Sequence, residues 1–449
     1  MDELLDAGRA AAAAACALAA DGETVEVRAT GLARRKHKVT GGGVRSSATV
    51  TAHGPYGLRL ARDGREAHLL TDTLSEPVVR QAFDDLREIV PHARRYHDRA
   101  ARHPDGGWSD DHHLDRRLHE PEQPLAGFWR DAQAAAATVG ERLRVDLTVM
   151  DCLVTVERHT ESFTGSDRVP VEFTYSRVEA RLLVQVRVGQ RQVRLWTAWN
   201  TNRLADVPLD HTLADAGLRG AAMLAGVSSA QPGGPLLLTP HTGAALLKVL
   251  AHDLFADPRG RRLEREPGWV PVDDARAPGG QHCRPIDHEG TYTGATVLLD
   301  PSGASVPLTV RAAEPGGALT GNAYMFRGFG APEPQPTNVR LQRVTDGEDD
   351  LGPYGFTGLL GVGLRGEGTQ RFRSGELLRF RIDTVVVRDG TVVDRADQLL
   401  VIATAADLVT AISAATPTGG YAPWRDFSSS CSWIALDGLA AAAVGTPSR

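Results

Sequence analysis

The stretch at residues 236–255, LLLTPHTGAALLKVLAHDLF, constrains the fold of this chain more than any other. Three leucines form a short apolar run, and a Thr-Pro-His-Thr-Gly turn separates them from a segment with helical periodicity. Leu247, Leu250, Ala251 and Leu254 recur at helical spacing and are predicted to face a core. The stretch is therefore predicted to form a buried strand, a tight turn and an amphipathic helix.

The composition is that of a soluble globular protein. The chain has 449 residues, 42% hydrophobic and 24% charged, with a formal net charge of −6. That length accommodates two or three domains, each with its own core. The acidic balance leaves no basic footprint for nucleic acid. The short cluster RRKHK at residues 34–38 is predicted to be a solvated turn rather than a binding patch.

The cysteines and the first residues indicate a cytoplasmic protein. Cys16, Cys152, Cys283 and Cys431 lie far apart and form no CxxC pair, so they are predicted to be reduced thiols. The N-terminus is acidic, unlike the positive start of a signal peptide. An alanine-rich run at residues 10–15 is too short to span a bilayer. No membrane association is expected.

Residues 1–226 are predicted to form an α+β domain of helices and antiparallel strands. The turn-rich segment VSSAQPGGP at residues 227–235 marks the predicted domain boundary. Helices are expected at 2–20, 76–90, 125–143 and 213–224, and strands at 24–29, 46–52, 57–61, 66–70, 144–159, 169–175, 180–188 and 192–199.

Residues 227–449 are predicted to form a β-rich, barrel-like domain. Asp389-Gly390 between two valine-rich runs is a strong hairpin signal. The glycines at 352–368 indicate a mobile or tightly turning loop. Helices are expected at 243–255 and 405–414, and strands at 295–299, 306–312, 338–344, 377–388, 391–403 and near 433–436.

Within the segment at residues 91–124, residues 95–124 hold five of the chain's 15 histidines together with many aspartates. Imidazole and carboxylate groups are metal ligands, so a metal-binding loop is one interpretation. No His-x₃-His pair lies there on a predictable helix. An exposed connector whose polar residues are solvated is the favoured interpretation.

Standard catalytic motifs are absent from the sequence. There is no GxxxxGK[ST] phosphate loop, no GxSxG elbow and no HExxH or HExxxH zinc pair. GVGLRG at residues 361–366 fits GxGxxG by letter, but no helix is predicted after it. His119-Glu120 is followed by Pro121, which disfavours the helix that a zinc pair requires.

Several ordered segments nevertheless resemble the TldD/PmbA family of metallopeptidases, also called the modulator of DNA gyrase family. The resemblance covers nearly the whole chain, and the order and spacing of the segments make it more specific than any one of them. They are HGPYGLRLARDGREA at 53–67, the strand-helix stretch at 236–255, DHEG at 287–290, TGNA at 320–323, PTN at 336–338 and GELLRFRIDTVVVRDGTVVDR at 375–395.

In this family, the catalytic subunit carries HExxxH on the helix that follows the apolar strand, with a cysteine ligand near the C-terminus. The resemblance places the His-Glu pair on Lys248-Val249 and the second histidine near His252 or Asp253. An ammonium group has no lone pair for zinc, and valine cannot act as a general base. Cys431 is displaced from the family's cysteine and is interpreted as structural or incidental.

The resemblance therefore implies a TldE/PmbA-type subunit without the zinc motif and without catalytic residues of its own. Such a subunit pairs as a heterodimer with an HExxxH-bearing TldD-like subunit. Zinc is expected in that partner and no cofactor in this chain. The complex is expected to take an extended peptide or peptide-derived substrate along a sheet edge, where main-chain hydrogen bonds tolerate varied sequences.

Two other hypotheses stay open. One is a divergent hydrolase or amidase of a specialised-metabolite or peptide-maturation pathway, with a rebuilt site drawn from Lys248, His252, Asp253, His241 and Cys431. The other is a binding module without catalysis.

The remaining family motifs supply four candidate polar contacts. Asp287 and Glu289 could form a carboxylate pair on one face of a strand. Structural hydrogen bonding is the favoured role for them. Asn322 and Asn338, in the G-N-A and T-N elements, are candidate structural or substrate contacts.

Overall fold

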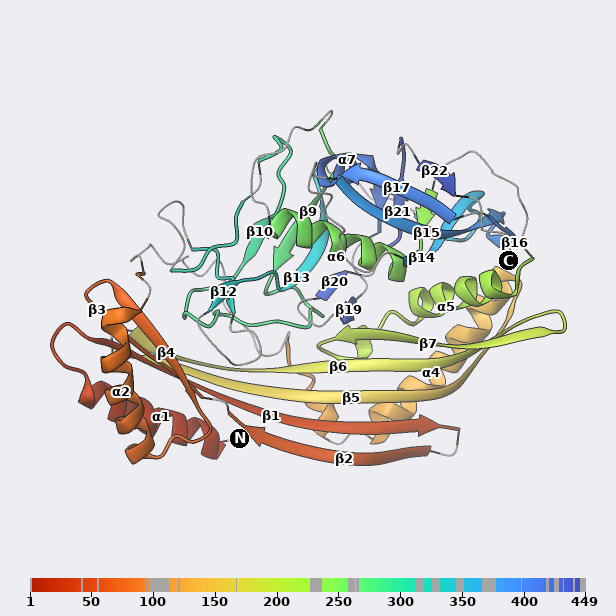
Figure 1. Cartoon of the computed structure of the whole chain (residues 1–449). Helices are drawn as coiled ribbons and strands as arrows, with labels where there is room; N and C mark the ends of the chain where they lie inside the picture. Colours follow the sequence, from red (N-terminus) through yellow and green to blue (C-terminus); the bar gives the residue numbers. More distant parts are fainter. Residues whose placement is uncertain are drawn as a thin grey trace.

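The structure is a computed structural model of the chain. It describes residues 2–41, 43–54, 56–93, 95–96, 108, 113–119, 122–166, 168–226, 236–256, 263, 266–304, 306–311, 319–324, 332–344, 351–365, 377–396, 398–416, 420–423, 428–430, 432–438 and 441–444. Among these residues, the strands form a twelve-stranded sheet, an eight-stranded sheet and a two-stranded ribbon (Figure 1). The α+β fold class predicted from the sequence is confirmed.

The N-terminal part pairs four antiparallel strands with two helices. Its elements are α1 (Asp2–Leu18), β1 (Thr24–Thr40), β2 (Gly43–His53), β3 (Tyr56–Arg62), β4 (Arg65–Thr71) and α2 (Glu76–Ile89). Val27, Leu60 and Phe83 belong to the core that these elements enclose. The turn between β3 and β4 places Asp63 at φ 52° and Gly64 at φ 68°, as a two-residue hairpin requires.

Three long strands form the middle of the twelve-stranded sheet. They are β5 (Asp146–Gly165), β6 (Arg168–Val188) and β7 (Arg191–Thr201), flanked in sequence by α4 (Glu122–Leu143) and α5 (Leu209–Leu224). The expected break between strands at 169–175 and 180–188 is wrong. The ladder between β5 and β6 runs on without interruption through the pair Arg158–Ser176 and its neighbours, so both segments belong to β6.

The basic cluster at residues 34–38 lies within β1, so the predicted solvated turn is wrong. Its residues pair with β2 on one side and β5 on the other. His37 is buried, whereas Arg35, Lys36 and Lys38 are exposed, which is the alternation of a strand with one covered face. Lys38 forms an ion pair of 2.7 Å with Asp151 of β5.

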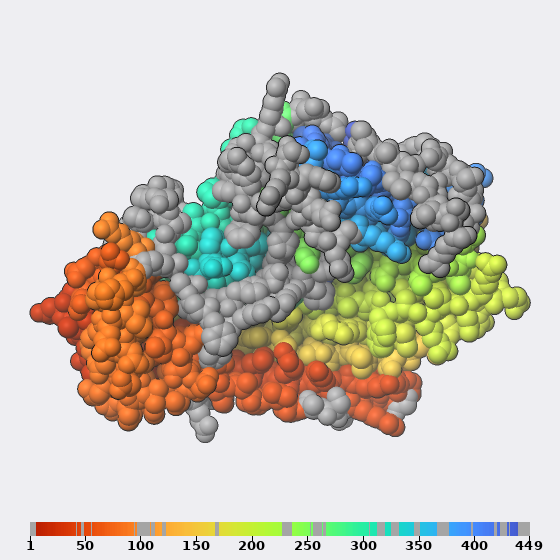
Figure 2. Space-filling view, in the orientation of Figure 1, coloured from red at the N-terminus to blue at the C-terminus, as the bar shows by residue number. Residues whose placement is uncertain are grey.

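The C-terminal part contributes strands to both large sheets. Short strands extend the twelve-stranded sheet beyond β7 in the order β19 (Tyr421–Pro423), β20 (Ser428–Ser430), β13 (Asn338–Arg343), β9 (Trp269–Asp274) and β10 (Ala295–Val297). β11 (Ala323–Tyr324) and β12 (Glu333–Pro334) form the separate ribbon. In Figure 2 this part (green to blue) lies above the β5–β7 strands (yellow), and the N-terminal strands (red) form the lower edge.

The eight-stranded sheet carries helices α6 (Pro240–Ala256) and α7 (Ala405–Ala411). Its strands are β18 (Ile412–Ala415), β21 (Ile434–Leu436), β8 (Leu236–Leu238), β14 (Gly358–Arg365), β15 (Leu377–Arg388), β17 (Gln398–Thr404) and β22 (Ala441–Val444), with β16 (Thr391–Arg395) paired to β15. The Asp389-Gly390 hairpin is confirmed, because both residues adopt positive φ between β15 and β16.

Three expectations for the C-terminal part are wrong. Residues 306–311 form no strand, because backbone N–H groups there bond to side chains: Thr309 donates to Thr320 Oγ1 and Arg311 to Glu289 Oε2. The glycine-rich segment at 352–368 is not simply a loop, since β14 occupies 358–365. Among the described strands, neither large sheet closes on itself, so the barrel-like form is not found.

The predicted division at residues 226 and 227 remains a prediction, and the segment 227–235 lies outside the described residues. The twelve-stranded sheet contains strands from both sides of that division. Within the described residues, no helix combines the length and apolarity needed to cross a membrane.

Candidate functional site

Helix α6 begins at Pro240, where proline suits the first turn because its missing N–H would have no helical partner. Thr239 precedes it and accepts the first helical hydrogen bond, from Gly243 N at 2.7 Å. The N–H of His241 points to Asp215 Oδ1 of α5 at 3.4 Å. A carboxylate at this end also complements the helix dipole. The N-terminus of α6 is therefore positioned by α5.

The predicted core face of α6 is confirmed. Leu247, Leu250, Ala251 and Leu254 are all at most 2% exposed and belong to the core under the eight-stranded sheet. The first turns of the helix also touch the chain near β20. Ser429 Oγ donates to Ala244 O at 2.7 Å.

Gly243 is required at this contact. A Cβ atom at Gly243 would lie 2.5 Å from the carbonyl oxygen of Ser432. The close approach fixes the distance between α6 and the segment that precedes β21.

The two positions that would carry the His-Glu pair are both half-buried. Val249 packs against the same core as Leu247 and Leu250, and Lys248 directly precedes it on the helix. Asp253 is 5% exposed. The side chain of His252 and all of Cys431 lie outside the described residues.

These residues do not fit a zinc ion. An ammonium group and an isopropyl group supply no lone pair for the metal. No group of three or more His, Cys, Asp or Glu side chains in the described part of the chain is arranged to hold a metal.

The rebuilt-site hypothesis joins residues that the helix keeps apart. His241 is in the first turn of α6 and Lys248 is seven positions further on. At 1.5 Å of rise per residue, their Cα atoms are separated by about 10 Å along the helix. His241 is exposed, and its backbone N–H is directed at α5. The geometry gives no support to a reaction centre that combines His241 with Lys248, and the rest of the hypothesis stays a prediction because the side chain of His252 and all of Cys431 lie outside the described residues.

Asp273, at the end of β9, organises two of the family motifs, and the sequence analysis missed it. Its carboxylate is fully buried and accepts hydrogen bonds from Thr337 N (2.6 Å), Thr337 Oγ1 (3.0 Å), Asn338 N (3.0 Å) and Asn322 Nδ2 (2.5 Å). Burial raises the pKa of Asp273 to about 6, although these hydrogen bonds lower it. The signal was a carboxylate at the end of an apolar run, WVPVDD.

Asn322 and Asn338 are both held by hydrogen bonds inside the protein. Asn322 Nδ2 also donates to Gln335 O at 3.1 Å. Asn338 Nδ2 donates to Asp274 O at 3.0 Å, and its Oδ1 accepts from His282 N at 3.0 Å. These contacts agree with the structural alternative for the two residues, and the substrate alternative stays a prediction.

Asp287 and Glu289 lie in a turn, so the strand geometry considered for them is wrong. Asp287 Oδ1 accepts from Glu289 N and Thr291 N, both at 2.9 Å, and its Oδ2 accepts from Ala323 N at 3.0 Å. Glu289 Oε2 accepts from Arg311 N at 2.8 Å. Burial raises the pKa of both carboxyl groups, and the negative charge of Asp287 raises that of Glu289 further.

A buried ionic network joins this turn to the N-terminal strands. Arg59 on β3 pairs with Glu26 at 3.0 Å and with Glu66 at 2.8 Å, and all three are at most 4% exposed. Arg311 reaches the same Glu26 at 3.3 Å. Because the chain segments are far apart in sequence, the network holds the N-terminal hairpin against the C-terminal part.

Between the long strands and residues 282–288 lies a group of basic side chains, which we call the basic layer: Arg28, Arg177, His282, Arg284 and His288. In the described part of the chain, Arg284 lies 3.6 Å from Glu161 and Arg177 lies 3.6 Å from Glu157. The guanidinium of Arg284 also lies 5.1 Å from the ring centre of Tyr324.

The basic layer contains polar atoms without hydrogen-bond partners. In the described part of the chain, Arg28 Nε and Nη1 and His282 Nε2 are buried and unpaired. Burial lowers the pKa of Arg28 to about 10, and burial and the neighbouring arginines lower the pKa of His282 well below its ordinary value. The layer thus keeps its positive charge on arginine and carries its histidines neutral at pH 7.

Sequence reasoning missed the basic layer because its members come from three distant segments. Arg28 faces Phe163 in the β1–β5 ladder, and Glu157 and Glu161 lie in a polar stretch of β5. The register that aligns these strands was not visible in the sequence.

The twelve-stranded and eight-stranded sheets, with α6 between β8 and the segment around β20, are the fold of the TldD/PmbA proteins. No protein-family model matches the sequence, and no curated protein matches it. The structure is similar to TldE from Thermococcus kodakarensis, with 14% identity and a TM-score of 0.65 over 93% of this chain and 96% of that one.

Two further solved structures are described as modulators of DNA gyrase. The protein from Thermotoga maritima matches with a TM-score of 0.64 over 98% of this chain and 100% of its own. The protein from Bacteroides thetaiotaomicron matches with a TM-score of 0.65 over 99% of this chain and 100% of its own. Each is 14% identical to this chain. The resemblance seen in the sequence is confirmed at the level of the fold.

Proposed function

We propose that this chain is a non-catalytic TldE/PmbA-like subunit of a heteromeric zinc metallopeptidase. The observation that carries the proposal is the state of α6. The helix keeps its capping, its core face and its contact with β20, but it carries Lys248 and Val249 where the catalytic subunit has its His-Glu pair. The position of the general base is filled by a side chain that packs against the core.

In this proposal the chain shapes a peptide-binding channel and supports the HExxxH-bearing partner, which holds the zinc. Edge strands offer the main-chain groups that an extended peptide needs. Among the described strands, β10 is an edge strand of the twelve-stranded sheet and β18 is an edge strand of the eight-stranded sheet, so each pairs with one other strand. The basic layer supplies a positive site for a peptide carboxylate, because Arg28 and His282 have buried polar atoms without partners in the described residues.

The partnership is tested by coexpressing the chain with a cognate HExxxH-bearing TldD-like protein. We expect the two to copurify as a heterodimer in size-exclusion chromatography with light scattering, and to cleave peptides only together. A stable homodimer of this chain that does not associate with the cognate protein would contradict the proposal.

The role of the basic layer is tested in the same complex. Arg28→Gln should weaken peptide binding and raise KM without dissociating the heterodimer. Arg388→Gln, an exposed arginine on β15, is the matched control and should leave KM unchanged. An unchanged KM in the Arg28 variant would remove the basic layer from the substrate site.

A further inference from the structure

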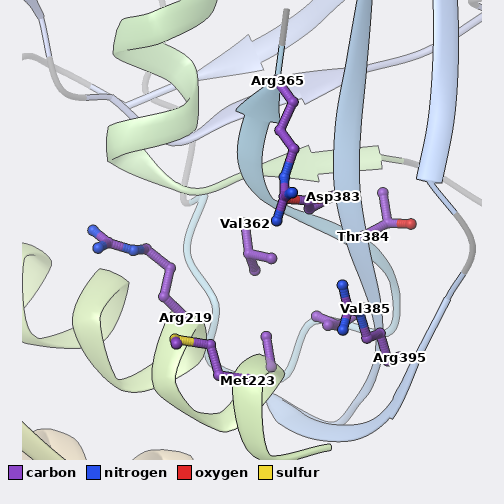
Figure 3. A pocket seen from close by; sticks show the side chains of 9 residues that line it. Arg219, Met223, Val362, Arg365, Asp383, Thr384, Val385 and Arg395 are labelled. Carbon is purple, nitrogen blue, oxygen red and sulfur yellow. The ribbon is translucent and has the colours of Figure 1, made fainter. Parts of the chain in front are cut away.

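A pocket of about 400 Å³ opens between helix α5 and strands β14, β15 and β16. Figure 3 shows Arg219 and Met223 on the helix side, and Arg365, Asp383 and Arg395 on the strand side. A volume of this size lies at the lower end of the range found for small-molecule sites, roughly 300–1,000 Å³. Asp383, Thr384, Val385 and Arg395 belong to the family segment at 375–395, whereas the five other lining residues lie outside the family segments.

The pocket is separate from the degenerate zinc positions. Val385, which lines it, belongs with Leu360 to the core that the sheet shares with α5. The neighbouring Val386 belongs to the core beneath α6. Because successive residues of a strand point to opposite faces, the pocket and α6 lie on opposite faces of the eight-stranded sheet.

The charged groups around the pocket favour an anion. Three arginines line it against one carboxylate. Arg365 is paired with Asp383 at 2.6 Å, and Arg219 with Asp215 at 2.9 Å. Arg395 is exposed, and within the described residues its guanidinium has no hydrogen bond or ion pair. The planar guanidinium of Arg395 is therefore available to bind a carboxylate or phosphate group through two parallel hydrogen bonds.

The remaining lining is apolar. Met223 is 63% exposed, the largest exposed fraction among the exposed large hydrophobic side chains of the described residues. Val362, Val385 and Ala222 complete the apolar wall beside it. A flexible thioether at the mouth of a pocket adapts to ligands of irregular shape. The wall suits an apolar body attached to the anionic group.

We infer that this pocket binds a small organic anion, with a carboxylate or phosphate group on Arg395 and an apolar body against Met223 and Val362. Arg365 and Arg219 add positive potential from both sides while they remain paired with aspartates. The site does not involve the degenerate zinc positions, since its residues lie on the sheet face away from α6. It would let a small organic anion bind this chain away from that helix.

The inference is tested by calorimetric titration of the full chain with three probes. N-acetyl-leucine and phenyl phosphate carry an anionic group on an apolar body, and N-acetyl-leucine amide is the uncharged match. We expect at least one of the two anions to bind, and the amide to bind at least about tenfold more weakly. Arg395→Gln should weaken binding of the anion about tenfold, because the variant loses a charged hydrogen-bonding group.

Two variants make the result specific to the pocket. Arg388→Gln changes an exposed arginine of the same sheet outside the pocket and should leave binding unchanged. Met223→Ala should weaken binding of phenyl phosphate. Binding of inorganic phosphate, titrated as an additional probe without an apolar body, should not change in this variant. The inference is overturned if neither anion binds, if the amide binds as well as the acid, or if Arg395→Gln and Arg388→Gln have equal effects. Circular dichroism of each variant confirms that it is folded, which the exposed positions of all three side chains favour.

Discussion

Removal of the Asp273 carboxylate should destabilise the fold far more than its replacement by an amide. In Asp273→Ala, the backbone N–H groups of Thr337 and Asn338 lose their acceptor in a buried site. A buried donor left without a partner costs about 1–3 kcal/mol, so two of them predict a loss of about 4 kcal/mol.

Asp273→Asn should lose at most about 1.5 kcal/mol, because two effects oppose each other. Its amide oxygen keeps an acceptor for Thr337 and Asn338, but these hydrogen bonds are weaker without the charge, by about 1 kcal/mol each. Burial raises the pKa of Asp273 to about 6, so the ionised group has a desolvation cost that both variants remove. The acceptor that the amide keeps for Thr337 and Asn338 therefore separates the two variants, although the NH₂ group of the amide faces the donor of Asn322.

The assay is urea unfolding of the purified variants, followed by tryptophan fluorescence and circular dichroism so that departures from two-state behaviour are visible. Asp300→Ala is the control, since Asp300 also accepts from backbone N–H groups but is only partly buried, and it should lose less than about 1 kcal/mol. Equal losses in Asp273→Ala and Asp273→Asn, or a loss below about 1 kcal/mol in the alanine variant, would refute this reasoning.

Three further predictions concern the packing and charge of the same regions. Burial and two neighbouring carboxylates raise the pKa of Glu289, so the folded chain retains a proton that the unfolded chain releases above the ordinary value of 4.5. The stability that Glu289 contributes therefore falls as the pH rises through that window. Glu289→Gln should gain stability over the parent chain with rising pH, and parallel pH profiles of the urea midpoint would contradict this. Gly243→Ala should destabilise α6, because its Cβ would lie 2.5 Å from a backbone carbonyl, whereas Gly127→Ala in α4 has no atom closer than 4.0 Å and should stabilise by about 0.5–1 kcal/mol. Arg59→Leu removes the ion-pair partner that two buried glutamates share and should cost about 3–5 kcal/mol. Arg365→Leu removes an exposed ion pair and should cost at most about 1 kcal/mol; thermal unfolding compares the two variants, and equal shifts would argue against the buried network.

Local patterns in the sequence predicted the elements whose physics is local. The helical spacing of Leu247, Leu250 and Leu254 identified the core face of α6, and Asp389-Gly390 identified a hairpin whose residues adopt positive φ. The valine-rich segments on either side of that hairpin are strands. Each of these signals depends on residues within a few positions of one another.

Features that depend on distant pairing could not be predicted in the same way. The segment 306–311 looked like a strand, but its N–H groups bond to Thr320 and Glu289 instead of a neighbouring strand. The role of Asp273 depends on loops more than 40 residues away. The basic layer depends on the register of β1 against β5. In each case the partner is chosen by the tertiary fold, which sequence periodicity does not contain.

For the candidate site too, the sequence predicted the local feature and the structure was needed for the tertiary contact. Substitution of the zinc motif at Lys248 and Val249 was visible in the sequence once the resemblance was recognised. That Val249 packs against the core beneath the eight-stranded sheet required the structure. Both observations bear on the general base, and together they motivate the proposal of a subunit without its own hydrolytic centre.

Zinc content and peptide cleavage, measured side by side on the purified chain and on its complex with a cognate HExxxH-bearing protein, test the central claim most directly. The account predicts no stoichiometric zinc and no cleavage for this chain alone, and one zinc per heterodimer with cleavage for the complex. Stoichiometric zinc and peptide cleavage by this chain alone would contradict it.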